Sequence, residues 1–249
     1  MISSIFQAII YQPLYNGLVV LLDILPGWAD AGIAIIILTF VVKLALFPLS
    51  RRAVQTQLRI KEIEPELNAL KAEFKDDRQT QAVKMMELYK KYKINPFLSS
   101  LLVFIQIPII FGLFFIARSG LPAINFDIIY PFIPKPSDVV NMNFIGLIDI
   151  AGKSFILAFG VGLSSFFQMK YSFPKPKPRE KGATPSFKDD LARSMHIQMR
   201  FVMPVVLGFV SYYISGAVAL YWITSNLFTI GQEVVTRRQF AKEKTAIKP

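Results

Sequence analysis

The chain has 249 residues, 53% of them apolar, and a mean hydropathy of +0.44, which is typical of an integral membrane protein. The absence of cysteine excludes disulfides, thiol nucleophiles and cysteine metal sites, and the single histidine leaves no histidine cluster for a metal. The net charge is +11, and the distribution of the charges along the chain is more informative than their total.

The N-terminal segment, residues 1–28, contains an uncharged stretch that polar residues, proline and glycine interrupt. It lacks the basic n-region of a secretory signal peptide. We expect a helix that lies in the membrane interface and is followed by a turn at Pro26 and Gly27. A transmembrane span is the alternative, because the stretch is just long enough to cross a bilayer.

The first expected transmembrane helix is residues 29–49, and Lys43 is the only charged residue in the apolar stretch 31–50. An ammonium group at membrane depth is costly, so Lys43 should face water, protein or a partner rather than lipid. That makes it a candidate functional residue. The alternative is that its flexible stem carries the charge toward the interface near Arg51.

Residues 50–95 are rich in charged residues, with apolar residues at the spacing of a coiled-coil seam. We expect a helical hairpin here, with a turn at Asp76 and Asp77 and a bend or break at Pro65. Such an arm could be solvated without a partner, or dock on a ribosome, a translocation channel or lipid headgroups. The expected seam consists of Ile63, Leu67, Leu70 and Phe74 in the first arm and Ala82, Met86 and Tyr89 in the second.

The rest of the chain contains further apolar segments separated by polar ones. An uncharged run at 201–232 is too long for one span, and the step from Ser215 to Gly216 divides it into two. The expected segments are the second transmembrane helix 96–118, an extracytoplasmic loop 119–143, the third transmembrane helix 144–170, a cytoplasmic loop 171–196, the fourth and fifth transmembrane helices 197–235, and a basic cytoplasmic tail 236–249.

The basic residues gather in three of the segments between spans. Residues 50–96 hold 11 Lys and Arg, residues 170–200 hold 8 and residues 236–249 hold 5, which is 24 of the 28. Five spans place all three segments on one side of the membrane, and the positive-inside rule assigns that side to the cytoplasm. The sequence therefore predicts an all-α integral membrane protein with five transmembrane helices, a cytoplasmic helical hairpin, an N-terminal interfacial helix and a cytoplasmic C-terminus.

No motif for catalysis stands out. The chain has no Walker A sequence, no G-x-G-x-x-G and no H-E-x-x-H. Ser164 and Ser165 follow glycines as in a serine nucleophile motif, but such an enzyme needs a base within reach, and His196 lies in a polar run near Arg200. The serines are more simply small residues for helix packing. We expect no enzyme activity, no catalytic residue, no metal and no cofactor.

Polar side chains accompany Lys43 on the other expected spans, among them Gln106, Gln168 and Asn226. They could converge on a wet cavity, or they could join helices through hydrogen bonds worth roughly 0.6–2 kcal/mol each. Taken together they favour a hydrophilic pocket without catalytic groups. A small transporter or channel, and a passive assembly factor for membrane complexes, are the alternative functions that these residues leave open.

Four local patterns, in this order and spacing, identify a family. They are Gly32–Thr39 with Lys43 and Phe47–Ser50; Tyr92–Pro96 leading to Gln106–Ile109; Leu147–Ile150 before a span that ends near Gln168; and Tyr221–Phe228 in the last span. The chain resembles the YidC family of membrane protein insertases from about Pro13 to Arg238.

The resemblance implies that the chain inserts proteins into the bacterial plasma (inner) membrane and helps them fold, through a positively charged hydrophilic groove open to cytoplasm and lipid. Nascent membrane proteins and membrane lipids would be its partners, with the ribosome and the Sec translocon as further candidates and no specific nucleic acid. Many bacterial members have Arg where this chain has Lys43, and Lys keeps the charge but loses the planar, multi-donor guanidinium. The implied groove residues are Lys43, Gln106, Gln168, Trp222 and Asn226.

Overall fold

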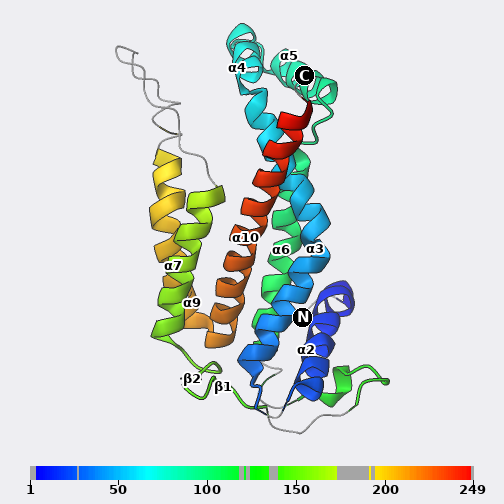
Figure 1. Cartoon of the computed structure of the whole chain (residues 1–249), viewed down its shortest axis with the longest axis vertical. Coiled ribbons are helices and arrows are strands. Elements are labelled where there is room, and N and C mark those ends of the chain that lie inside the picture. The colour runs from blue at the N-terminus through cyan, green and yellow to red at the C-terminus, as the bar shows by residue number, and fades with distance from the viewer. Residues whose placement is uncertain are drawn as a thin grey trace. The chain divides into compact units, whose positions relative to one another are not determined.

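The computed structural model describes residues 4–26, 28–117, 121, 124–134, 140–172, 191 and 194–247. The described chain is mostly helical. It divides into two compact units, of which unit 1 comprises residues 1–44 and 108–231 and unit 2 comprises residues 45–107 and 232–249. The division falls within the three long helices of Figure 1, α3 (Ala31–Glu62), α6 (Phe97–Phe115) and α10 (Gly216–Ile247).

Unit 1 begins with a helical segment made of α1 (Ser4–Phe6), the π-helix η1 (Gln7–Tyr11) and α2 (Gln12–Ile24). By length and composition, residues 4–24 are one of three described helices that could cross a membrane, together with residues 31–62 and 194–214. The sequence favoured an interfacial helix for this segment and kept a span as the alternative. Its length and hydropathy fit the alternative as well.

Polar residues that interrupt the N-terminal apolar run hold a loop in place. Asn16 is 1% exposed, donates to the carbonyl of Ile128 at 2.9 Å and accepts from the N–H of Tyr130 at 2.7 Å. The Tyr15 hydroxyl accepts from the N–H of Asn125 at 2.7 Å. Helix α2 thereby fastens the loop that contains η3 (Phe126–Ile128), because buried backbone groups need such partners.

Helices α7 (Phe155–Ser172) and α9 (Met203–Ile214), with the π-helix η4 (Gln198–Val202) before α9, lie side by side in unit 1 (Figure 1). A Cβ atom on Gly208 of α9 would come within 3.0 Å of the Ala158 carbonyl oxygen of α7. On α7, a Cβ atom on Gly160 would come within 2.9 Å of the Ile223 side chain of α10. Small residues therefore bring α7 close to both neighbours, as in many membrane helix pairs.

The structure confirms the expected break in the long uncharged run: α9 ends at Ile214, Ser215 is extended, and α10 begins at Gly216. The N–H of Gly216 donates to the Gly152 carbonyl at 2.8 Å. A Cβ atom on Gly216 would meet the Ile150 Cα at 2.8 Å, so this step requires glycine.

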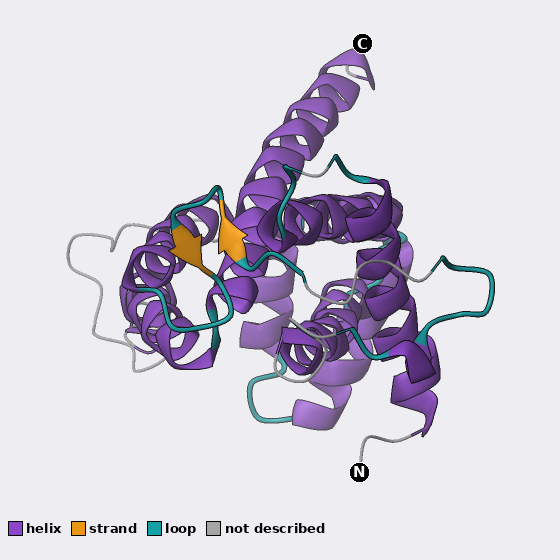
Figure 2. Cartoon of the chain, turned by 90° about the horizontal axis from the view of Figure 1, so that it is seen from below, coloured by secondary structure: helices purple, strands orange, loops and turns teal. Residues whose placement is uncertain are grey.

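A short β-hairpin precedes α7, and the sequence did not predict it. Strands β1 (Asn143–Phe144) and β2 (Ile148–Asp149) pair antiparallel (Figure 2). The third transmembrane helix was expected to start at residue 144, whereas α7 starts at Phe155. The apolar residues expected at the start of this transmembrane helix lie in the hairpin instead. The carbonyl of Ile150, the residue after β2, accepts from the N–H of Ala217.

In unit 2 the chain leaves α3 at Glu62 and continues as α4 (Glu64–Glu73) and α5 (Arg78–Lys91), which pack against each other. Helix α3 has no break at residue 49, where the first span was expected to end. The expected interruption at Pro65 is confirmed, since Pro65 lies in the first turn of α4. The expected turn ends at Asp77, whose carboxylate caps α5 by accepting from the N–H groups of Gln79 and Thr80.

The apolar seam of this two-helix segment agrees with the prediction for Ile63, Leu67, Leu70 and Tyr89, does not include Phe74, and is shifted along the second arm. Its buried residues are Ile63, Leu67, Leu88 and Ile94, with Ile60, Leu70, Met85 and Tyr89 packed against them. The prediction for Met86 is wrong, because it is 38% exposed, and Ala82 is also exposed. Lys93 has a φ of +54°, and the N–H of Ile94 then donates to the Tyr89 carbonyl at 2.8 Å. This cap turns Ile94 into the seam and favours the face of α5 that carries Leu88.

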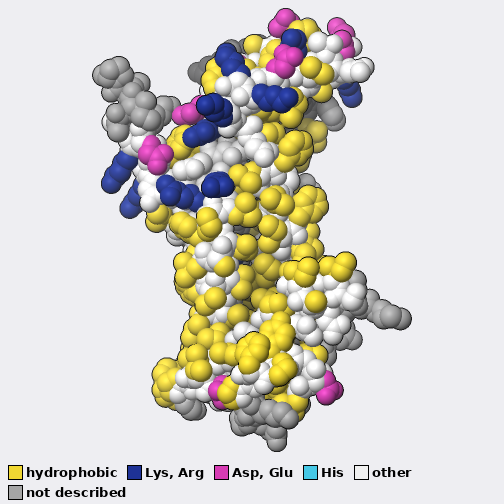
Figure 3. Space-filling view, turned by 90° about the vertical axis from the view of Figure 1, so that its right-hand side faces the viewer, with side chains coloured by type: hydrophobic (Ala, Val, Ile, Leu, Met, Phe, Trp, Pro, Cys, Tyr) yellow, Lys and Arg dark blue, Asp and Glu magenta, His cyan; other side chains and the backbone are white. Residues whose placement is uncertain are grey.

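Large apolar side chains also cover much of the outer surface. On the face shown in Figure 3, hydrophobic side chains form wide stretches with few charges among them. On α7 and α9, Phe155, Ile156, Phe159, Val205 and Phe209 are each 65–76% exposed. Such faces are costly in water and are typical of helices that contact lipid.

Candidate functional site

Lys43 contacts α10 within unit 1. Its Nζ donates to the Thr229 hydroxyl at 3.4 Å, and that hydroxyl donates in turn to the Ser225 carbonyl at 2.8 Å. One turn earlier, Phe40 of α3 meets Phe228 of α10 edge to face, with ring centroids 5.6 Å apart. The Lys43 side chain is half-buried. The ammonium group is therefore directed to a protein partner on α10, in keeping with the cost of placing it in lipid.

Asn226 joins α10 to α7. Its Nδ2 donates to the hydroxyls of Ser164 at 3.1 Å and Ser165 at 2.9 Å. Both serines are buried, and Ser164 donates to the Val161 carbonyl of its own helix. These contacts agree with the interhelical role that the sequence left open for the amides, and with the packing role it gave the serines. They do not form the nucleophile–base pair that a serine enzyme needs.

Trp222 and Gln168 lie one helical turn from these contacts. Trp222 is four residues before Asn226 on α10, so the two share a helix face. Gln168 is three residues after Ser165 on α7, and its Nε2 donates to the Ser172 hydroxyl at 3.4 Å. Both side chains are half-buried. Four of the expected groove residues therefore lie on α3, α7 and α10 within unit 1, and polar contacts join these helices. They are Lys43, Gln168, Trp222 and Asn226.

Gln106 is different, because it belongs to unit 2. It is half-buried on α6, two residues before the Pro108 that lies within that helix. Its role in the groove stays a prediction from the sequence.

Sequence reasoning missed Thr229 and gave the two serines no polar role. Thr229 comes three residues after Asn226 in an apolar helix, so it shares the helix face of Asn226 and Trp222. That spacing was a usable signal. The partners of Asn226 could not be read from sequence, because they depend on how closely α7 approaches α10.

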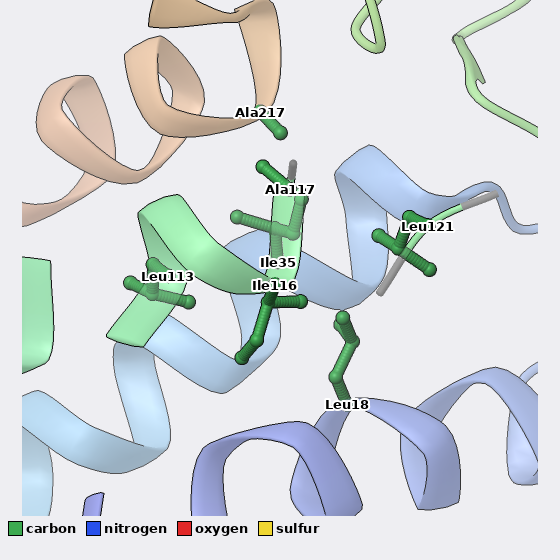
Figure 4. Close-up of a pocket in the computed structure, with 7 residues that line it drawn as sticks. All are labelled: Leu18, Ile35, Leu113, Ile116, Ala117, Leu121 and Ala217. Atoms are coloured by element: carbon green, nitrogen blue, oxygen red, sulfur yellow. The ribbon is translucent and has the colours of Figure 1, made fainter. Parts of the chain in front are cut away.

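Unit 1 also contains a small apolar pocket (Figure 4), which has room for about one water molecule. Its walls carry no side-chain hydrogen-bonding group, so it is a packing defect and does not suit a polar ligand. The pocket is lined by Leu18, Ile35, Leu113, Ile116, Ala117, Leu121 and Ala217. Among the described residues, no three His, Asp or Glu side chains gather as they would around a metal ion.

Comparison with known proteins gives one consistent result. The profile of the family described as "60Kd inner membrane protein" matches residues 24–244. Proteins named "Membrane protein insertase YidC" are 29% identical over 94% of this chain in Ectopseudomonas mendocina, 28% over 83% in Clostridium tetani and 31% over 86% in Francisella tularensis subsp. novicida. The chain spans 35% and 34% of the first and third relatives and 81% of the Clostridium protein.

The apolar helices, the polar contacts between them and these relatives define a multi-pass protein of the bacterial inner membrane. The chain belongs to the 60Kd inner membrane protein family, which is the YidC/Oxa1 family.

Proposed function

We propose that this chain is a membrane protein insertase that places other proteins in the inner membrane and helps them fold. The observation that carries the proposal is the direction of Lys43, an ammonium on an apolar helix that contacts the hydroxyl of Thr229 on α10. Relatives named for this activity match most of the chain. A basic residue beside hydroxyl and amide groups can attract the acidic or polar part of a substrate without any covalent step.

The proposed mechanism lowers a physical barrier. Moving a hydrophilic segment across about 30 Å of hydrocarbon is unfavourable because its polar groups lose their hydrogen bonds. A hydrophilic groove lined in unit 1 by Lys43, Gln168, Trp222 and Asn226 brings water partway into the membrane and shortens the dry path. The apolar helix of the substrate then moves sideways into lipid, where its burial is favourable.

The proposed topology has five transmembrane helices, and the C-terminus is in the cytoplasm. It rests on the 24 of 28 basic residues that lie in three segments of the chain. In this arrangement α4 and α5 form a cytoplasmic hairpin, which would receive substrates from the ribosome or the Sec translocon. The N-terminal helix, residues 4–24, lies in the interface or spans the membrane.

Crosslinking tests the proposal against its alternatives. A photo-crosslinker at position 43 should capture many different nascent membrane proteins in their ribosome-bound form. The same group at Phe209, which is 65% exposed on α9, is the control for contacts made through lipid alone. Capture of one stable partner at position 43 would indicate an assembly factor, and ion or solute flux through the purified protein without any capture would indicate a transporter.

A further inference from the structure

The turn between β1 and β2 exposes apolar side chains. Ile145 is 65% exposed and Leu147 is 85% exposed, on either side of Gly146. The N–H of Leu147 donates to the Phe144 carbonyl at 3.1 Å and closes a two-residue turn. Turns that face water usually carry polar residues. Nothing in the hydrogen bonding of this turn requires two large apolar side chains.

The backbone of the turn is strained at Ile145. Its φ is +55° and that of Gly146 is +69°, a combination that usually selects Asn-Gly. A β-branched residue in this region is a conformational outlier, and such strain persists only where the surroundings enforce it. Gly or Asn at position 145 would adopt this φ at lower cost, so the apolar side chain is kept at a cost in stability.

Asp30 enforces the strained turn. Asp30 is 3% exposed, and its carboxylate accepts from the N–H of Ile145 at 2.8 Å and from the N–H of Ile33 at 3.0 Å. The second bond caps the first turn of α3. The N–H of Ala31 donates to the Asn141 carbonyl at 2.9 Å. The turn is therefore fixed to the start of α3, and its apolar side chains are held away from the protein.

Several features place this end of unit 1 at the membrane boundary. Helix α7 has 18 residues, or about 27 Å, which is close to the hydrocarbon thickness of about 30 Å. It begins at Phe155, a few residues after β2. Trp28, two residues before Asp30, is 75% exposed, and the Lys153 ammonium lies 4.9 Å from the ring centroid of Tyr213. Exposed Trp and Tyr with a neighbouring Lys are typical of the interface.

We propose that the turn Ile145–Leu147, positioned by Asp30, inserts into the boundary between headgroups and acyl chains and anchors this end of the helices. Its partner is the lipid surface itself. At the start of α7, Phe155 and Ile156 are also exposed, at 76% and 68%, as expected for side chains that meet lipid. Insertion at this depth is the mode of interfacial anchors. The anchor extends to α10 through the bond from Ala217 to the Ile150 carbonyl.

Fluorescence in vesicles tests the proposal. The chain has no cysteine, so Leu147→Cys gives one site for an environment-sensitive dye. Asp127→Cys, on an exposed position of η3, is the matched control. In phosphatidylcholine–phosphatidylglycerol vesicles, we expect nitroxide lipids to quench the dye at position 147 and aqueous iodide to quench it several-fold less than at position 127. Equal iodide quenching at the two positions would overturn the proposal. Shielding of position 147 in native membranes but not in pure vesicles would overturn it in favour of a protein partner.

A second variant tests the positioning role of Asp30. Asp30→Asn in the Leu147→Cys protein weakens the acceptor that holds Ile145, so quenching by nitroxide lipids should fall while thermal unfolding still shows a folded protein. Unchanged quenching would show that Asp30 does not position the turn. Neither measurement requires insertion activity, so failure here is separate from failure of the proposed function.

Discussion

Two regions use polar residues in opposite ways: α7 with the parts of α3 and α10 that belong to unit 1, and the α4–α5 segment of unit 2. In unit 1 polar side chains are sparse in apolar helices, and Lys43 and Asn226 each bond to a neighbouring helix. In α4–α5 charges are abundant and exposed, as in the pair of Lys84 and Glu87 at 2.9 Å. Exposed pairs of this kind contribute about 0–1 kcal/mol. Polar contacts should therefore matter most in unit 1, and apolar packing in α4–α5.

The largest expected effect is on the α4–α5 seam. Leu67→Ala removes a side chain that is 4% exposed and should cost about 2–5 kcal/mol. Trypsin cleavage in α4–α5, a region rich in Lys and Arg, should then become at least about 30-fold faster in the native protein, if cleavage follows local opening. Met86→Ala, at a position 38% exposed on α5, is the control and should change the rate little. Equal effects of the two substitutions would contradict the observed seam.

A smaller effect is expected where Asn226 joins α10 to α7. A double-mutant cycle of Asn226→Ala and Ser165→Ala should give a coupling of about 0.6–2 kcal/mol, measured from unfolding in detergent. The coupling arises because either change removes the same bond, 2.9 Å long. Thr224→Ala, which breaks a bond only within α10, is the control and should not couple to Ser165→Ala. Strict additivity for Asn226 and Ser165 would show that the bond contributes nothing.

The smallest effect should have the opposite sign. Lys93 has a φ of +54°, so Lys93→Gly relieves strain and should stabilise α5 by about 1 kcal/mol. Amide hydrogen exchange in α5 should slow about fivefold. Lys90→Gly is the matched control, because it lies in the last turn of the helix and should destabilise it by about 1 kcal/mol. Faster exchange in both variants would mean that the left-handed position carries no strain.

Much of the fold could be predicted from local rules. Proline at the first turn of α4 and the step at Ser215 and Gly216 are backbone effects that a sequence shows directly. The spacing of apolar residues in the first arm correctly predicted Ile63, Leu67 and Leu70, but not the absence of Phe74 from the cluster. The prediction of Ala82 and Met86 for the second arm failed because the chain caps α5 at Lys93 and turns Ile94 inward. That packing is a tertiary consequence of one backbone conformation.

The site was predictable in its residue types and less so in its contacts. Lys43 stood out because a charge in an apolar helix is costly, and in the structure its ammonium donates to the hydroxyl of Thr229. The roles of Asp30 and of the strained turn at Ile145 depend on residues far apart in sequence, 30 with 145, and no local pattern marks them.

The most direct test of the account is insertion into liposomes that contain the purified protein alone. The substrate is a small single-span protein with a short acidic tail, and the variants are Lys43→Arg and Lys43→Glu. Insertion should persist with Arg, which keeps the positive charge, and fall strongly with Glu, which repels the tail. Equal insertion by the native protein and both variants would contradict the role of Lys43 as the charge that attracts substrates.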